Sequence, residues 1–198
     1  MGSFNREEMK RLILVLVLFG STSALADFQA GVDAYNRGDY AGAYDEWLPL
    51  AEQGHAGAQY NLGALYGDGH IDPPDDAAAA RWFRLSAEQG NAPAQFALGK
   101  IYRRGQGVPQ DDAKAVKWYR LAAEQRHAEA QAVLGAMYAQ GYGVSQDLVQ
   151  AYAWFQLADA QGYKPAQSLR GIIQRLMTPA QITEALKTSR ELSRRLEQ

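Results

Sequence analysis

The sequence predicts an all-α protein: a right-handed α-solenoid of stacked antiparallel helix pairs that ends in a C-terminal capping helix. The prediction rests on a segment that recurs at a fixed step and on apolar residues that recur at helical spacing. The segment is AQYNLGALY at Ala58–Tyr66, AQFALGKIY at Ala94–Tyr102 and AQAVLGAMY at Ala130–Tyr138, a step of 36 residues both times. A fixed period of this length is typical of helical arrays, whose units stack to bury one continuous core.

The recurring segment is expected to form the first helix of each unit. Its Ala, Leu, Gly and Tyr fall at relative positions 1, 5, 6 and 9, which lie on one side of a helix. A glycine inside a helix costs about 1 kcal/mol relative to alanine. Because Gly63, Gly99 and Gly135 repeat this cost, we expect a second helix to approach closely at each glycine, with the following tyrosine beside the contact.

A glycine-containing loop and a second helix complete each unit. The loop RRGQGVPQD at Arg103–Asp111 is matched by AQGYGVSQD at Ala139–Asp147, and its glycines suit a positive φ after a helix end. The Asp that ends each loop is a good N-cap, so second helices are predicted over about Asp111–Gln125 and Asp147–Gln161. Their alanines and aromatic pairs recur at helical spacing and are expected to pack against the first helix and the next unit.

The first 26 residues are predicted to be a secretory signal peptide. Lys10 and Arg11 precede the apolar run Leu12–Phe19, and Ala24–Ala26 reads as an A-x-A cleavage site. The apolar run is too short to cross a bilayer, which takes about 20 residues. Met9 offers an alternative start, which would make the residues before it an upstream extension.

Cleavage after Ala26 implies an exported protein without a stable membrane anchor. The pattern is that of a Gram-negative-type Sec signal, so the mature chain is expected to be periplasmic or secreted. No cysteine follows the apolar run or occurs anywhere in the chain, which argues against a lipoprotein anchor. The lack of cysteine is compatible with export, because an oxidising compartment permits disulfides without requiring them.

The C-terminal residues are predicted to cap the array with a helix that begins at Pro179 and ends near Leu196. Thr178 is the N-cap candidate, and Gln181 completes a capping-box pattern. The helix has sparse apolar residues (Ile182, Leu186 and Leu192) and a basic remainder, which suits a solvated outer face. The domain plan is therefore a signal peptide (1–26), an array over 27–177 with units at about 27–54, 56–90, 92–126, 128–162 and a part-unit at 163–177, and a capping helix over 178–198.

The motifs AxxxLGxxY, GxGVxxD and KAxxWYxxAA resemble the Sel-one-like repeat, a longer-looped relative of the tetratricopeptide repeat. DDAKAVKWYRLAAEQ at Asp111–Gln125 is a very close match. Three full repeats span about Ala56–Gln161. Phe28–Gly54 resembles a leading repeat with a short loop, and Gly162–Arg175 resembles the first helix of a fifth unit.

Departures from the repeat pattern mark places where the structure should differ. Ile71 and Asp72 stand where the later loops have Gly and Val, so the loop of the first full repeat is expected to take a different path. Arg170 replaces the repeat leucine in the fifth unit, and Asp159 replaces an alanine. One cysteine-rich branch of the family is associated with β-lactam binding or hydrolysis, and this chain has no cysteine, so that activity is not expected here.

The sequence shows no catalytic or metal-binding constellation, so we expect a protein that is not an enzyme and has no cofactor. His55 and His127 lie at the turns before first helices, where they are expected to cap. The pairs Asp75–Asp76 and Asp111–Asp112 lie at helix starts and are read as caps and helix-dipole partners. A net charge of −2 gives no support for a nucleic-acid binder.

By the family resemblance, the first helices line a concave groove, and their variable positions become candidate peptide-binding residues. Tyr60 and Phe96 are aromatic residues one repeat apart, whereas Lys100, Arg103 and Arg104 form a basic group in a mildly acidic protein. We expect the groove to bind an acidic or C-terminal segment of a partner through guanidinium–carboxylate pairs. The alternative is that both rings pack against the next repeat and the arginines are solvated.

The expected function is that of an exported protein–protein interaction adaptor that binds a partner protein or peptide in this groove. One alternative is a peptidoglycan- or glycan-binding module that uses Trp82, Trp118 and Trp154 as stacking platforms. Another is a β-lactam or peptidoglycan hydrolase, by family analogy only. At helical spacing beside alanines, the tryptophans are expected to be core residues instead.

Overall fold

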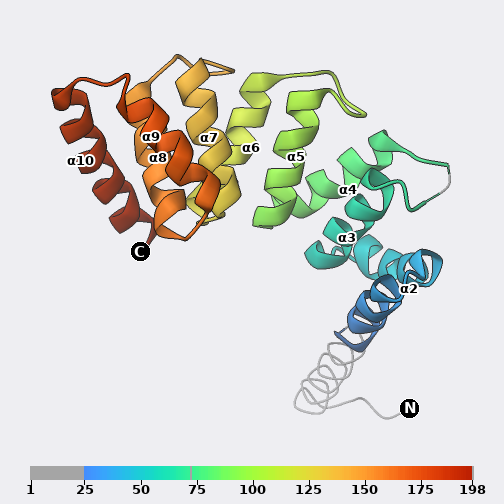
Figure 1. Ribbon diagram of the computed structural model, residues 1–198. Coiled ribbons are helices and arrows are strands. Elements are labelled where there is room, and N and C mark those ends of the chain that lie inside the picture. The colour runs from blue at the N-terminus through green and yellow to red at the C-terminus, as the bar shows by residue number, and fades with distance from the viewer. Residues whose placement is uncertain (1–24, 72, 198) are drawn as a thin grey trace, which may run out of the picture.

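The computed structural model describes residues 25–71 and 73–197, which form an array of helices (Figure 1). Residues 25–36 are helical. The helices that follow are α2 (Tyr40–Glu52), α3 (Ala56–Gly67), α4 (Asp76–Glu88), α5 (Ala92–Arg104), α6 (Asp112–Glu124), α7 (Ala128–Gln140), α8 (Leu148–Ala160), α9 (Lys164–Gln174) and α10 (Pro179–Leu196). Each helix from α2 to α8 packs against the next one in the sequence. The predicted all-α solenoid is confirmed.

Glycines set the close approach inside each helix pair, as predicted. A Cβ added to the glycine of the first helix would overlap an aromatic ring of the second. The distance from that Cβ to the nearest ring atom would be 2.8 Å for Gly63 and Phe83, 2.7 Å for Gly99 and Tyr119, and 3.0 Å for Gly135 and Phe155. The same relation joins Gly31 to Trp47. Residues 25–36 and α2 therefore form the leading helix pair that the sequence predicted.

The repeat tyrosines lie where one repeat meets the next. Arg84 of α4 donates from Nη2 to the hydroxyl of Tyr102 in α5 at 2.9 Å. Arg120 of α6 donates in the same way to Tyr138 of α7 at 2.6 Å. These tyrosines therefore help fix the register between successive repeats.

Buried glutamines also join successive repeats. The side chain of Gln95 is 3% exposed, and its Nε2 donates to the carbonyl oxygen of Ala87 in the preceding repeat at 3.1 Å. Its Oε1 accepts from Nε2 of Gln125, at the end of its own repeat, at 2.8 Å. Gln59 and Gln131 make the equivalent bonds. This glutamine recurs in every copy of the motif, and its role had no counterpart in the sequence predictions.

The loops cap the second helices as predicted. The carboxylates of Asp75, Asp111 and Asp147 each accept a hydrogen bond from backbone N–H groups in the first turn of the helix that follows. In the two later loops a glycine with positive φ lies against the preceding repeat. A Cβ on Gly107 (φ 65°) would lie 2.3 Å from the carbonyl oxygen of Asp76, so only glycine fits there.

The loop of the first full repeat takes a different path, as the sequence indicated. Ile71 occupies the position of Gly107 but does not have a positive φ, and it packs against the core of the leading pair. His70 stacks on Tyr40, with ring centroids 3.7 Å apart and an interplanar angle of 12°. This loop therefore closes over the leading pair instead of following its later copies.

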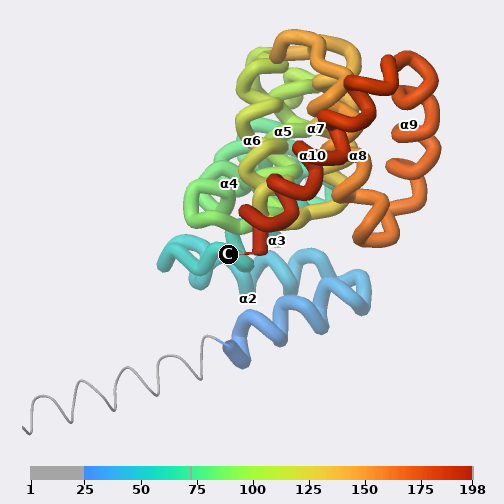
Figure 2. Tube along the Cα trace, turned by 90° about the vertical axis from the view of Figure 1, so that its left-hand side faces the viewer, coloured from blue at the N-terminus to red at the C-terminus, as the bar shows by residue number. Residues whose placement is uncertain are grey.

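The capping helix α10 occupies the predicted residues, but it does not complete a fifth pair with α9. It begins with the predicted capping box of Thr178 and Gln181, and it packs against α8. Figures 1 and 2 show α9 and α10 apart from each other, each beside α8. Gly171 is in phase with the glycines of the earlier repeats, yet no described side chain lies within 4 Å of a Cβ built there.

Two departures from the repeat pattern prove to be one contact. Arg170, which replaces the repeat leucine, pairs through Nη2 with Oδ2 of Asp159 at 3.0 Å. Its guanidinium also donates to Oε1 of Gln156 and lies 5.9 Å from the ring centre of Tyr152. The two departures compensate each other. Arg170 and Asp159 form a half-buried ion pair at the positions where the earlier repeats have a buried leucine and an alanine.

We predict that Gly99→Ala lowers the free energy of unfolding by about 1–3 kcal/mol, because the added methyl group overlaps the Tyr119 ring. Gly171→Ala is the matched control, and it should raise the free energy by about 0.5–1 kcal/mol because its site is open. Urea unfolding followed by circular dichroism measures both. Equal effects of the two substitutions would contradict the close approach at Gly99.

We predict that Gln95→Leu lowers the free energy of unfolding by about 1–3 kcal/mol, because it removes two hydrogen bonds, one to the carbonyl of Ala87 and one from the side chain of Gln125. Gln140→Leu, at an exposed site in α7, is the control and should change stability little. Urea unfolding again gives the comparison. The glutamine bonds would not hold successive repeats together if Gln95→Leu were as stable as the parent.

Candidate functional site

The exposed face of the first helices is the candidate binding surface. Leu62, Leu98 and Leu134 are fully buried, whereas three other positions in each first helix stay half-buried or exposed. We call these the groove positions. By the 36-residue step they are Asn61, Ala64 and Asp68 on and just after α3, Ala97, Lys100 and Arg104 on α5, Val133, Ala136 and Gln140 on α7, and Leu169, Ile172 and Leu176 on and just after α9.

The structure gathers most of the predicted site residues around one hollow. This hollow lies between α5 and α7 and has a volume of about 390 Å³. Its lining includes Phe96, Lys100, Arg103 and Arg104 of α5, together with Tyr119, Glu129 and Val133. Tyr60 lies outside it and lines a second hollow of about 270 Å³ near the leading pair.

The two predicted aromatic anchors take part in packing. Phe96 is 9% exposed, and its ring centroid lies 5.6 Å from that of Tyr119 and 4.8 Å from that of His127. Tyr60 is half-buried, with its ring centroid 5.7 Å from that of Phe83. Both rings thus pack on the second helix of their own repeat, and Phe96 forms part of the hollow's wall. Their role in binding a peptide stays a prediction.

The three cations at the hollow are exposed and lack an internal counter-ion. Within residues 25–71 and 73–197, no carboxylate oxygen lies within 4.0 Å of the side-chain nitrogens of Lys100, Arg103 or Arg104. Lys100 Nζ lies 5.8 Å from the ring centre of Phe96, which holds the ammonium near the hollow. The group is therefore able to pair with an anion from outside the chain.

Tyr119 is 1% exposed and lies beneath this basic hollow. Burial raises the pKa of Tyr119 to about 12, against the opposing effect of the nearby cations Arg103 and Arg104. The phenol therefore keeps its proton near neutral pH and adds no negative charge beneath the cations. Glu129 contributes the single negative charge among the residues that line the hollow.

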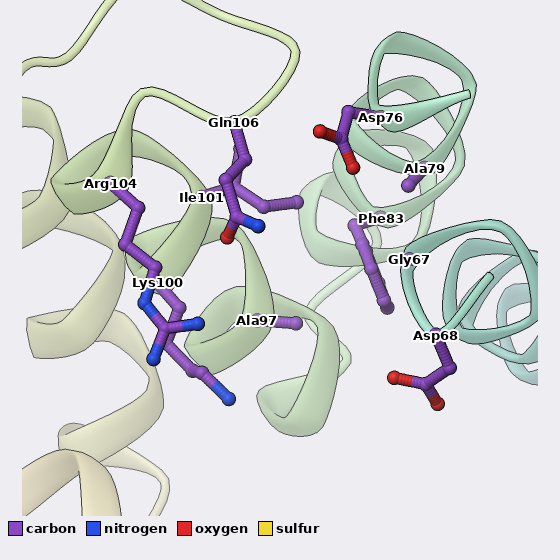
Figure 3. A pocket seen from close by; sticks show the side chains of 10 residues that line it. All are labelled: Gly67, Asp68, Asp76, Ala79, Phe83, Ala97, Lys100, Ile101, Arg104 and Gln106. Atoms are coloured by element: carbon purple, nitrogen blue, oxygen red, sulfur yellow. The ribbon is translucent and has the colours of Figure 1, made fainter. Parts of the chain in front are cut away.

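A third hollow, of about 150 Å³, lies between α5 and the preceding repeat (Figure 3). Lys100 and Arg104 project from one side of it, and Asp68 and Asp76 lie on the opposite side. Lys100 and Arg104 also line the hollow next to α7, and Asp68 also lines the one beside Tyr60. The three hollows therefore follow one another along α3, α5 and α7, with carboxylates at one end and cations in the middle.

The histidines cap helices, as predicted. Nδ1 of His127 accepts from the backbone N–H of Ala130 at 3.2 Å, and His55 does the same at Ala58. Asn91 fills the equivalent position before α5. Burial lowers the pKa of His127, and the nearby Glu129 carboxylate partly opposes that effect.

Other kinds of site find little support in the part of the chain that the structure describes. No group of three His, Asp or Glu side chains there could hold a metal ion. No helix in that part is long and apolar enough to cross a membrane. Trp154 is buried, and Trp82 and Trp118 are half-buried against the core, so the tryptophans are not open stacking platforms.

The sequence predictions missed part of the groove. Glu129, Val133 and Tyr119 line the basic hollow, and none was named as a site residue. Leu169, Ile172 and Leu176 were also missed, because the fifth unit was considered only as a partial repeat. Extending the 36-residue step from Val133, Ala136 and Gln140 would have found these three.

We predict that folding stability falls as the pH drops through about 6.5, the ordinary pKa of histidine, and that His127→Asn removes part of this dependence. The pKa of His127 is lowered in the folded protein, so the unfolded chain takes up the proton first and gains from acid. Asn91 shows that asparagine makes the same cap without titrating. Urea midpoints at about pH 7.5 and about pH 5.5 give the test; the same loss of stability in both proteins would exclude His127 as a source.

Comparisons with known proteins agree with this architecture. A family model described as the Sel1 repeat matches residues 56–91, 92–127 and 128–163. The crystal structure of a Sel1 repeat protein from Oxalobacter formigenes is 33% identical, with a TM-score of 0.70, over 73% of this chain and 60% of that one. A protective antigen present in uropathogenic Escherichia coli strains, described as displaying an SLR fold, is 27% identical, with a TM-score of 0.64, over 91% of this chain and 48% of that one.

This chain therefore spans between about half and three-fifths of the length of these two solved structures. No curated protein matches it in a comparison of sequences. Sel1 repeats are commonly non-catalytic scaffolds that mediate protein–protein interactions. The match over three successive repeats, together with the helix pairs that they form, shows that the chain belongs to the Sel1 repeat family.

Proposed function

We propose that the protein is an exported, non-catalytic adaptor that binds an acidic segment of a partner protein in the groove of its first helices. The observation that carries the proposal is the uncompensated basic group of Lys100, Arg103 and Arg104 beside a hollow of about 390 Å³. In a chain with a net charge of −2, three exposed cations at a concave site favour a negatively charged ligand.

The chemistry of the hollow suits a carboxylate. Arg103 and Arg104 each offer a planar fork that pairs with two carboxylate oxygens, and Lys100 adds a point charge. An aspartate or glutamate side chain, or the C-terminal carboxylate of a peptide, would meet these groups together.

Export rests on the N-terminal sequence pattern. The proposed signal peptide lies outside the described residues except for Leu25 and Ala26, which are both exposed. We propose that cleavage after Ala26 releases the array into the periplasm or the medium. Neither a glycan-binding nor a hydrolase role gains support from the arrangement of side chains, since the tryptophans pack in or against the core.

The test uses the mature chain, residues 27–198, as bait on a periplasmic extract. A second bait carries Lys100→Glu, Arg103→Glu and Arg104→Glu, and a third carries Lys187→Glu, Arg190→Glu and Arg194→Glu on the exposed side of α10. We predict that the parent and the α10 variant capture the same partner and that the groove variant loses it by tenfold or more. Quantitative mass spectrometry of the bound proteins measures the loss.

The third bait separates the groove from overall charge, because both variants change the net charge equally. Circular dichroism should show the same helix content in all three baits, since every substituted residue is exposed. Equal capture by the groove variant would move the binding site away from Lys100, Arg103 and Arg104. Equal loss in both variants would mean that non-specific charge, not the groove, drives capture.

A further inference from the structure

The groove positions change in chemical character along the array. They include one carboxylate (Asp68) at α3 and two cations (Lys100 and Arg104) on α5, whereas they are all uncharged on α7 and all large and apolar at α9. At α9 the three side chains are large and exposed: Leu169 by 36%, Ile172 by 54% and Leu176 by 66%. Leu169 and Ile172 lie three residues apart on one side of α9, and Leu176 follows in the turn just after the helix. We call these three residues the α9 stripe.

No described part of the chain covers this stripe. The helix that follows α9, α10, packs on α8 and not on α9. The side of α9 where a second helix would pack carries Gln167, Gly171 and Gln174 and no large apolar residue, so the stripe does not serve a missing fifth pair. The other exposed large apolar residues in the described chain are scattered over separate helices and loops. A clustered apolar stripe of this kind marks a contact surface.

We infer that the α9 stripe is the apolar end of the binding groove and that it takes large apolar side chains of the same partner segment whose acidic residues pair with Lys100 and Arg104. This inference rests on the proposed function. Between the two ends, Val133 and Ala136 offer a half-buried, uncharged surface over which a chain can pass. The partner segment is therefore acidic at one end and apolar at the other.

The distance between the two ends sets the length of the segment. Directly packed helices lie roughly 10 Å apart, but α5 and α7 do not pack directly on each other, because α6 packs on both. Two steps from α5 through α7 to α9 therefore cover more than about 20 Å. Because an extended chain advances about 3.3 Å per residue, the apolar residues of the partner should lie more than about six residues from its acidic residues.

The charges around the stripe favour a partner segment over a second copy of this chain. Lys164 and Arg175 are exposed near the two ends of α9. If two copies paired through antiparallel α9 helices, Lys164 of one would approach Arg175 of the other, and like charges repel. A segment that carries acidic residues meets no such repulsion.

The test measures fluorescence anisotropy with two labelled peptides. The first probe holds only an acidic run of Asp and Glu. The second adds Leu-Phe-Leu after a Gly/Ser spacer of about ten residues, which can extend beyond about 20 Å, and it is made in both chain directions. The proteins are the parent, the triple variant Leu169→Gln, Ile172→Gln and Leu176→Gln, and a control with Leu85→Gln and Leu121→Gln, which replaces exposed leucines on the second helices.

We predict that the two-ended probe in one direction binds the parent at least about tenfold more tightly than the acidic probe, as burial of two or three apolar side chains implies. The α9 variant should lose this gain and bind both probes alike, whereas the control should keep it. No gain in the parent, or a gain that survives in the α9 variant, overturns the inference. A parent that sediments as a dimer and becomes a monomer on α9 substitution overturns it too, because a second copy then covers the stripe.

The acidic probe tests the proposed function separately. If it binds the parent and is lost on reversal of Lys100, Arg103 and Arg104, the basic site stands whatever α9 does. The other outcome is that the charge reversal leaves the affinity of the acidic probe unchanged while the α9 substitutions still weaken binding of the two-ended probe. In that case the proposed function fails and the apolar stripe remains a binding surface.

Discussion

The rest of the structure depends on the contact between a glycine in each first helix and an aromatic ring in its second helix. At Gly99 the ring of Tyr119 occupies the space that any side chain would need. Such close approach buries alanines and leucines between the two helices, and their burial is what stabilises the pair. Because the contact recurs from Gly31 to Gly135, all four pairs share one geometry, and their outward-facing positions fall into rows.

The glutamine bonds convert these pairs into an array with a defined register. Gln95 joins the end of the preceding repeat to the end of its own through one buried and one part-buried hydrogen bond, and a buried bond left unmade is costly. Alanine and leucine alone would let neighbouring repeats slide. A polar contact with directional requirements does not, so the groove positions of successive repeats stay aligned and can act on one extended ligand.

Periodic residues made most of the fold predictable, since three internal copies reveal which positions are tied to packing. The cap at Asp111 and the glycine at Gly99 follow from the step alone. The course of α10 did not follow, because Ile182, Leu186 and Leu192 specify a buried face without specifying which helix buries it. For the site, the step showed that Lys100 and Arg104 are free of packing. It could not show that the ring of Phe96 packs between Tyr119 of its own repeat and His127 of the next one, because that depends on how the two repeats pack together.

The groove can be specific for one segment because the residues at its positions differ, although the helix pairs beneath them repeat. A uniform array would bind a segment equally well in any register and in either direction. The groove breaks that equivalence, because it presents carboxylates at Asp68 and Asp76, cations at Lys100 and Arg104, and an apolar stripe at α9. An acidic residue is favoured at the cations and disfavoured at the carboxylates and at the apolar stripe. A partner segment with an acidic and an apolar end would therefore have one preferred direction and one preferred register. Its specificity would come from the order of its residues more than from the strength of any single contact.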